Sequence, residues 1–407
     1  MTVPRGALGH PAVAVVASSV VAQLALLVSG PLVVRLLGVS GRGELALVWS
    51  VVLGTSQLAM LGLPSAVTWF AASRGIDPAR IIAELRRGYL VQVVVTALAV
   101  GAAVALLSGG GWLRAVVAVA GVVALMLAVL GLAALQGAGR FGAFAILQAL
   151  PAVLYATAVT TLFLLDSGSV TALLALSLAG WAVVAAVSMT LSTSGSGADL
   201  PSVGEARSYG RRAMIAGLAP IDTLGLEQVL LGLVTGHYVL GLFVVGWAFE
   251  TGPVMVLAAL AAFVGPRLSA LRIGRPEFVR RWLLIALGLG VAVCLAIQLV
   301  LAPVLVWAFG AEAEPAVDLA RVLTVAGVIL GLRRITAACL VGLGHATEAT
   351  VAELVGLATM VLGMLMMTLA YDPILPGLVL IAAGTVTLFG QSLVLIRALS
   401  PAVRASP

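Results

Sequence analysis

Charged residues are scarce in this chain. They make up 9% of its 407 residues, whereas a soluble domain typically carries roughly 25%. Lysine is absent, so all 22 basic residues are arginines, and 62% of the chain is hydrophobic. This composition excludes an ordinary soluble protein and predicts a membrane protein.

The residues from which enzyme active sites and metal sites are built are also scarce. The two cysteines, Cys294 and Cys339, lie in apolar runs, so no disulfide framework is predicted. The three histidines are far apart and have no Cys or carboxylate at ligand spacing, which excludes a structural zinc site. The sequence has no P-loop and no closely spaced Ser-His-Asp or Cys-His set. We therefore expect a transporter rather than an enzyme, with no metal and no other cofactor.

Long apolar runs are what the chain has in abundance. About twelve of them reach the roughly 20 residues that a helix needs to cross a bilayer. The first run follows Arg5 but is too long for a signal peptide, so it is interpreted as a retained anchor. The predicted fold class is an all-α polytopic membrane protein with about 12 transmembrane helices. The runs lie near residues 12–34, 45–66, 89–107, 115–135, 143–165, 170–191, 214–234, 239–264, 283–305, 317–340, 349–370 and 378–396.

The arginines lie at the ends of these runs and not in one patch, which argues against nucleic acid as a partner. Most of them fall in one alternate set of loops and in both tails. The opposite loops hold only Arg35, Arg42, Arg114 and Arg321. Because basic residues are retained on the cytoplasmic side of a membrane, both termini are predicted to be cytoplasmic.

The two halves of the chain resemble each other. A shift of 198 positions superposes Gly38 on Gly236 and Gly43 on Gly241, and a shift of 205 superposes LQGAGR (135–140) on LVGLGH (340–345). Such matches between equivalent loops are typical of parallel repeats in transporters. We predict two pseudo-symmetric six-helix lobes, residues 1–200 and 201–407, around a central cleft. The Ser- and Gly-rich stretch 192–212 is interpreted as the linker between them.

A few charged residues interrupt the apolar runs of the second half. Asp222 and Glu227 lie in the seventh run, Glu250 in the eighth, and Arg333 and Arg334 in the tenth. At about 1.5 Å per residue, Glu227, Glu250 and Arg333 share a depth of roughly 15–20 Å below the outer surface, with Asp222 deeper. Each charge costs about 2.5–3.5 kcal/mol at the centre of a membrane helix, so these side chains are expected to face protein or water.

Two interpretations of this charged layer remain open. Glu250 could pair with Arg333 or Arg334 and only fix the packing of the helices. Alternatively, at least one of the three carboxylates could bind H+ or Na+ during transport, because burial favours its neutralised form. Asp222 and Glu227 point about 140° apart on a helix, so they are not expected to share a site. The first half carries amides instead, which could line a cleft or bond a neighbouring helix: Gln23, Gln57, Gln92 and Gln148.

Several stretches, in order along nearly the whole chain, resemble one known family. They are RLLGVSGRGELALVWS after the first run, LQGAGRF after the fourth, EQVLLGLVTGHYVLGLF at the seventh and eighth, GPRLS after the eighth and LVGLGHA after the tenth. The chain is similar in these stretches to bacterial polysaccharide flippases of the multidrug/oligosaccharidyl-lipid/polysaccharide exporter superfamily. It departs from their pattern at Arg42-Gly43-Glu44 and at Phe243, both at the outer rim.

The resemblance implies a flippase that moves a polyprenyl-pyrophosphate-linked saccharide to the outer leaflet of a bacterial plasma membrane by ion-coupled alternating access. Glu227 stands where many relatives carry a carboxylate in the seventh helix. Arg333 and Arg334 become candidates for the pyrophosphate, because arginine forms bidentate bonds to phosphate oxygens. The implied partners are the lipid-linked saccharide, membrane lipids, H+ or Na+ and glycan-assembly proteins.

Two other functions are weighed against this one. A drug/cation antiporter of the same fold would be expected to carry a carboxylate in its first helix, but residues 12–34 contain no ionisable side chain. A membrane-embedded lipid-phosphate transferase could use Arg35, Arg42 and Arg321 at the outer face. It would lack a large outer loop to hold an acceptor.

Overall fold

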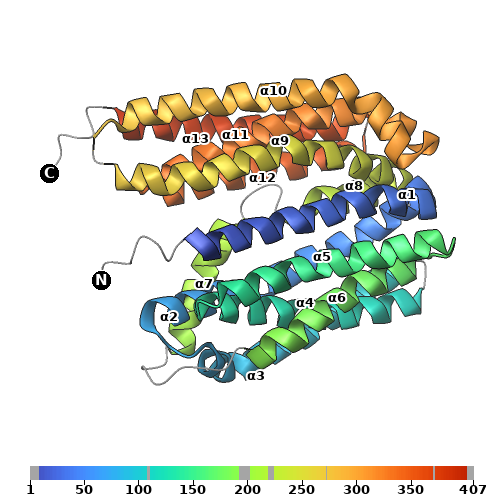
Figure 1. Ribbon diagram of the computed structural model, residues 1–407, viewed down its shortest axis with the longest axis horizontal. Helices are drawn as coiled ribbons and strands as arrows, with labels where there is room; N and C mark the ends of the chain where they lie inside the picture. Colours follow the sequence, from blue (N-terminus) through green and yellow to red (C-terminus); the bar gives the residue numbers. More distant parts are fainter. Residues whose placement is uncertain are drawn as a thin grey trace. The chain divides into compact units, whose positions relative to one another are not determined.

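The computed structural model describes residues 9–107, 111–191, 202–218, 224–271, 273–369 and 372–400. Every regular element within these ranges is a helix (Figure 1). Ten of the described helices are long and apolar enough to cross a membrane. The predicted all-α polytopic membrane fold is therefore confirmed, while the exact count of twelve spans stays a prediction.

The helices pack into two compact units. The first comprises residues 1–37 and 47–215, and the second comprises residues 38–46 and 216–407. The outer end of the first hairpin, 38–46, thus belongs to the second unit. The first unit also extends 15 residues beyond the boundary predicted at residue 200.

In the first unit, α4 is the central helix and packs against α2, α3, α5 and α6. Small residues let it approach α6 closely, since a Cβ atom at Gly131 would lie 2.0 Å from Ser188 Oγ. The helices that begin in this unit are α1 (Gly9–Ala59), α2 (Leu63–Arg74), α3 (Pro78–Leu107), α4 (Trp112–Gly137), α5 (Phe141–Leu164), α6 (Val170–Leu191) and α7 (Val203–Leu218).

In the second unit, α11 is the central helix and packs against α9, α10, α12 and α13. It runs parallel to α9, because Gly246 of α9 meets Ala320 near the start of α11, and Gly265 meets Gly342 at its end. The elements of this unit are α8 (Leu226–Thr235), α9 (His237–Ala270), α10 (Arg275–Phe309), the 3-10 helix η1 (Ala311–Ala316), α11 (Val317–Gly342), α12 (Ala346–Met366) and α13 (Leu375–Leu399).

Helix α1 contains the first predicted membrane run, 12–34, and most of the second, 45–66, which was expected to be continuous but is interrupted at Gly62 (φ 69°) and ends in α2. Its 51 residues correspond to about 77 Å at 1.5 Å per residue, more than twice the hydrocarbon thickness of a bilayer. Gly38 interrupts the helical geometry with φ 71° and ψ 173°. This break lies between the predicted runs 12–34 and 45–66, where the chain was expected to turn.

The seventh predicted run, 214–234, is not one helix. Helix α7 ends at Leu218 and α8 begins at Leu226, with Gly225 at φ 64° immediately before it. Asp222 lies outside the described residues. A glycine in the left-handed region cannot continue a right-handed helix, so the prediction of a continuous span is wrong. The predicted linker 192–212 is likewise helical from Val203 onward.

The turns that follow α4 and α11 have the same backbone structure. Gly139 and Gly344 both have positive φ, 72° and 92°. The next N–H group donates five residues back in each turn, Arg140 to Leu135 and His345 to Leu340, both at 2.9 Å. Each turn is a Schellman motif that satisfies the last carbonyls of its helix. The sequence match at a shift of 205 positions therefore reflects a shared local structure.

Candidate functional site

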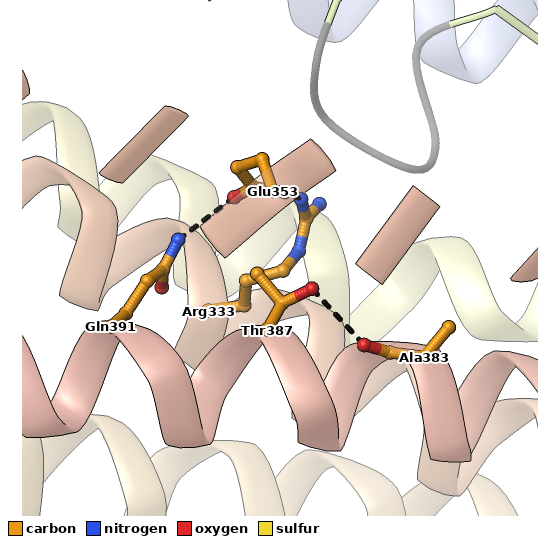
Figure 2. Close-up of polar contacts among 5 residues, drawn as sticks. All are labelled: Arg333, Glu353, Ala383, Thr387 and Gln391. Carbon is orange, nitrogen blue, oxygen red and sulfur yellow. Dashed lines mark hydrogen bonds and ion pairs between the residues drawn. The ribbon is translucent and has the colours of Figure 1, made fainter. Parts of the chain in front are cut away.

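A buried ionic cluster joins three helices of the second unit (Figure 2). Arg333 of α11 forms an ion pair with Glu353 of α12 through Nη1 and Oε2. Gln391 of α13 donates from Nε2 to the other carboxylate oxygen, Oε1, at 2.9 Å. The exposed fractions of Arg333, Glu353 and Gln391 are 0%, 5% and 0%. Both carboxylate oxygens of Glu353 therefore accept a hydrogen bond from a side chain of a neighbouring helix.

Helix α13 contributes to this cluster through one of two neighbouring polar side chains, Thr387 and Gln391. Thr387, one turn before Gln391 on α13, donates to the carbonyl of Ala383 in its own helix at 3.0 Å. The hydroxyl of Thr387 is therefore not a donor to Glu353, and α13 contacts this carboxylate through the amide of Gln391. Removal of one partner from a buried ion pair typically costs about 3–5 kcal/mol, because the other charge is left uncompensated.

The environment of Arg333 bears on its predicted role in binding pyrophosphate. Its side chain is fully buried and engaged with Glu353, so a phosphate could not reach it in this structure without displacing a carboxylate. Arg334 follows it on α11 and is only partly buried. The assignment of both residues to phosphate binding stays a prediction, and Arg334 is the more accessible of the two.

Glu250 lies on α9 at a different level from Arg333. Its carbonyl oxygen packs against α11, 2.4 Å from where a Cβ atom of Gly327 would be. Gly327 precedes Arg333 by six residues, which is about 9 Å along the helix. The side chain of Glu250 is 2% exposed. The structure thus pairs Arg333 with Glu353, a partner that the sequence interpretation did not include.

Glu227 is the second residue of α8 and is 3% exposed. Helix α8 packs against α9 and α12, the helices that carry Glu250 and Glu353. The first turn of a helix carries a partial positive charge from the aligned peptide dipoles, which favours a carboxylate at this position. Because the chain breaks before α8, Glu227, which is predicted to bind a cation, lies at the positive end of a helix dipole.

Three carboxylates and one arginine are buried in the described part of the second unit. Among the described residues, the buried carboxylates are Glu227, Glu250 and Glu353, whereas the only buried basic side chain is Arg333. Arg334 is partly buried on α11 as well. A carboxylate in apolar surroundings is retained together with a basic partner, a bound cation or a proton. No group of three His, Cys, Asp or Glu side chains gathers as metal ligands in the ranges that the structure describes.

The sequence analysis missed Glu353 and Gln391 as members of the site. A signal for Glu353 was present, because it is an acidic residue inside the eleventh apolar run and an intramembrane charge indicates a buried partner. Gln391 gave a weaker signal, since an amide in a membrane helix commonly bonds to its neighbours without any functional role.

Comparisons with known proteins find structural likeness without sequence likeness. No family model matches the chain, and no curated protein does. A structure of the lipid II flippase MurJ in an inward closed conformation matches with a TM-score of 0.76 and 10% identity, over 94% of this chain and 87% of that chain. An inward-facing multidrug resistance MATE family transporter of the MOP superfamily matches with a TM-score of 0.73 and 16% identity, over 95% and 96%. A MOP superfamily transporter from Pyrococcus furiosus matches with a TM-score of 0.62 and 14% identity over the full length of both chains.

These matches define the class of the fold. The chain has the fold of a multi-pass membrane transporter, and the similar solved structures are transporters rather than enzymes. The fold is similar to that of solved MOP superfamily transporters, the superfamily whose members the sequence stretches resemble. At these low identities the likeness concerns the fold alone and assigns no substrate.

Proposed function

We propose that this protein is a flippase that exports a saccharide linked to polyprenyl pyrophosphate, driven by H+ or Na+. The observation that carries the proposal is the burial of Glu227 and Glu250, which are 3% and 2% exposed, in the second unit of a transporter fold. Burial of a carboxylate in apolar surroundings favours its binding of a proton or a cation. Release of that ion would then be linked to a change of conformation.

The proposal assigns a different role to each group of buried residues. Glu227 and Glu250 are the coupling groups, whereas Glu353 is held by Arg333 and Gln391 and has a structural role. Arg334 is one proposed contact for the pyrophosphate during transport, because arginine binds phosphate oxygens in a bidentate manner. Asp222 remains a further candidate for ion coupling on the basis of the sequence.

Two lines of support favour a lipid-linked saccharide as the substrate. The motifs along the chain resemble polysaccharide flippases, and one similar structure is a lipid II flippase. The polarity of the loops supports cytoplasmic termini in a bacterial plasma membrane, since most arginines fall in one set of loops. Glycan-assembly proteins on the cytoplasmic side are the partners expected for such an exporter.

The proposal is tested by depletion of the protein and extraction of the polyprenyl-linked saccharides. We expect the lipid-linked intermediate to accumulate in the cytoplasmic leaflet, where a membrane-impermeant glycosidase can reach it only after the membrane is opened. Wild-type protein should restore the normal pool. Unchanged lipid pools after depletion would contradict the proposal.

A drug/cation antiporter is the second candidate, because a multidrug resistance transporter is among the similar structures. It predicts that expression of the protein raises tolerance to cationic drugs and leaves the lipid-linked saccharides unchanged. The same depletion and expression strains therefore distinguish the two functions.

A further inference from the structure

The first unit contains a cavity of about 650 Å³, within the usual size range of small-molecule sites. Five helices contribute to its walls: α2, α4, α5, α6 and α7. The lining residues are Pro64, Ser65, Thr68, Trp69, Ala72, Val129, Leu132, Ala133, Gln136, Phe144, Gln148, Trp181 and Tyr209. They all belong to the first unit, so the cavity is separate from the ionic cluster.

The chemistry of this lining is polar, aromatic and uncharged. Its polar groups are two amides, two hydroxyls, one phenol and two indole N–H groups. The phenol, the two indoles and Phe144 provide four aromatic faces, and the lining includes no Asp, Glu, Arg or His. Aromatic faces pack against the apolar C–H surfaces of a ligand, whereas amides and hydroxyls fix its orientation by hydrogen bonds. A site with both features and no charge suits a neutral, hydroxyl-rich ligand.

The two amides are free to serve a ligand. Gln136 and Gln148 are both exposed, and no side-chain hydrogen bond engages either of them within the described part of the chain. Thr68, in contrast, already donates to the carbonyl of Ala133 at 3.0 Å. A side-chain amide offers two donor hydrogens and one acceptor oxygen, so the pair can bond both hydroxyl and acetamido groups.

The wall formed by α2 and α7 is held rigidly. The rings of Trp69 and Tyr209 stack with centroids 4.8 Å apart and an interplanar angle of 25°. Below them the two backbones touch, since a Cβ atom at Gly62 would lie 1.9 Å from the carbonyl oxygen of Gly210. The aromatic surface is therefore formed before a ligand arrives, which reduces the entropy lost on binding.

No arginine lines the cavity, but two arginines are bonded to or close to the helices that form its walls. The guanidinium of Arg74 stands 5.8 Å from the ring centroid of Trp69 and forms an ion pair with Glu205 of α7 at 2.5 Å. Arg140, between α4 and α5, donates to the carbonyl of Leu191 at the end of α6. Both arginines belong to the loops that the charge bias assigns to the cytoplasm. A ligand with a neutral body and an anionic neighbour would match this distribution.

We propose that this cavity binds the sugar next to the pyrophosphate of the exported lipid on the cytoplasmic side of the membrane. The inference rests on the proposed function and adds a saccharide subsite to it. If the cavity instead bound an alkyl chain of a lipid, the chain would displace water from Gln136 and Gln148 without giving their amides a hydrogen-bond partner, which costs free energy. A cationic drug would find no carboxylate in the lining.

The test compares two probes on purified protein in nanodiscs: polyprenyl pyrophosphate, and the same lipid bearing one N-acetylglucosamine. Their relative binding is measured by competition in native mass spectrometry. The variant is Gln136→Ala with Gln148→Ala, two exposed side chains whose truncation should not affect folding. The control is Gln298→Ala in the second unit, which removes an amide bonded to the carbonyl of Arg321 at 2.9 Å.

We expect the wild type and the control to prefer the sugar-bearing lipid, and the double variant to lose roughly ten-fold of that preference, since each neutral hydrogen bond contributes about 0.5–1.5 kcal/mol. Binding of the sugar-free lipid should not change. Equal binding of both lipids by the wild type, or a preference that survives in the double variant, would overturn the saccharide subsite and leave the flippase proposal intact. Binding of neither lipid by the wild type would instead defeat the proposed function.

Discussion

The backbones of Gly43 and Gly241 meet in the second unit with no room for a side chain. A Cβ atom at Gly43 would lie 1.8 Å from the carbonyl oxygen of His237, and one at Gly241 would lie 2.0 Å from that of Val39. The two contacts are reciprocal, because Gly241 and His237 are each 198 positions after Gly43 and Val39. The repeat visible in the sequence therefore forms a local two-fold relationship within this unit.

A side chain at Gly241 should destabilise the protein. Gly241→Ala would force a methyl group into a backbone carbonyl, and such overpacking typically costs about 1–3 kcal/mol. We expect a midpoint of thermal unfolding several degrees lower in detergent solution. Gly288→Ala in α10 is the matched control, because a Cβ atom there meets nothing within 4 Å. An equal midpoint for both variants would show that the contact is more pliable than its geometry indicates.

Loss of Arg333 should be far more damaging than loss of both members of its ion pair. Arg333→Met leaves Glu353 buried without its cation, which is expected to cost about 3–5 kcal/mol. Adding Glu353→Gln removes the charge, and Gln391 can still donate to the new amide oxygen. The double variant should regain most of the yield and thermal stability that the single variant loses, as a double-mutant cycle measures.

The surface pair between Arg321 and Asp318 provides the control for that cycle. Their side chains are 51% and 78% exposed, with Nη1 and Oδ1 3.2 Å apart. Exposed pairs contribute little to stability, so Arg321→Met should leave the unfolding midpoint almost unchanged. An effect as large as that of Arg333→Met would indicate a response to the loss of any arginine.

Neutralising Glu227 should uncouple transport from the ion gradient while leaving the fold intact. Glu227→Gln keeps the shape and the hydrogen-bonding capacity of the side chain but removes the charge that holds the ion. We expect uptake of fluorescent polyprenyl lipid by proteoliposomes to fall to background under imposed H+ or Na+ gradients. Glu314→Gln in η1 alters an exposed carboxylate and should transport normally. Full activity of Glu227→Gln would shift the coupling role to Glu250 or Asp222.

The orientation of the chain can be measured with single cysteines. Cys294 and Cys339 are buried, so both can be replaced by alanine to give a background without thiols. Ser73 at the end of α2 and Ser167 between α5 and α6 are both exposed. We expect a membrane-impermeant maleimide to label Ser167→Cys in intact spheroplasts and Ser73→Cys only after permeabilisation. The reverse pattern would contradict cytoplasmic termini.

The sequence predicted the class of fold well because apolar runs of membrane length have few alternatives in a bilayer. The same criterion misled at 214–234, where overall apolarity concealed the break before α8. A hydropathy average does not respond to one glycine, although Gly225 with φ 64° is enough to separate two helices. Matches between the repeats were more informative, since LQGAGR and LVGLGH proved to share one turn geometry.

The candidate site was predicted in part. Depth along each run singled out Glu227, Glu250 and Arg333, and all three are buried in the second unit; their depth in a membrane stays a prediction. Depth could not indicate which faces of the helices meet, so it suggested Glu250 as a partner for Arg333 or Arg334 and did not indicate Glu353. Pairing with Glu353 depends on how α11 and α12 are rotated about their own axes, which is decided by packing.

Arg333 gives the second unit a counter-ion that cannot diffuse away. In the proposed cycle an exchangeable proton or sodium ion would leave the carboxylates, whereas the guanidinium of Arg333 is covalently part of α11 and is paired with Glu353. In the ion-free step of that cycle, Arg333 would reduce the repulsion among the buried carboxylates.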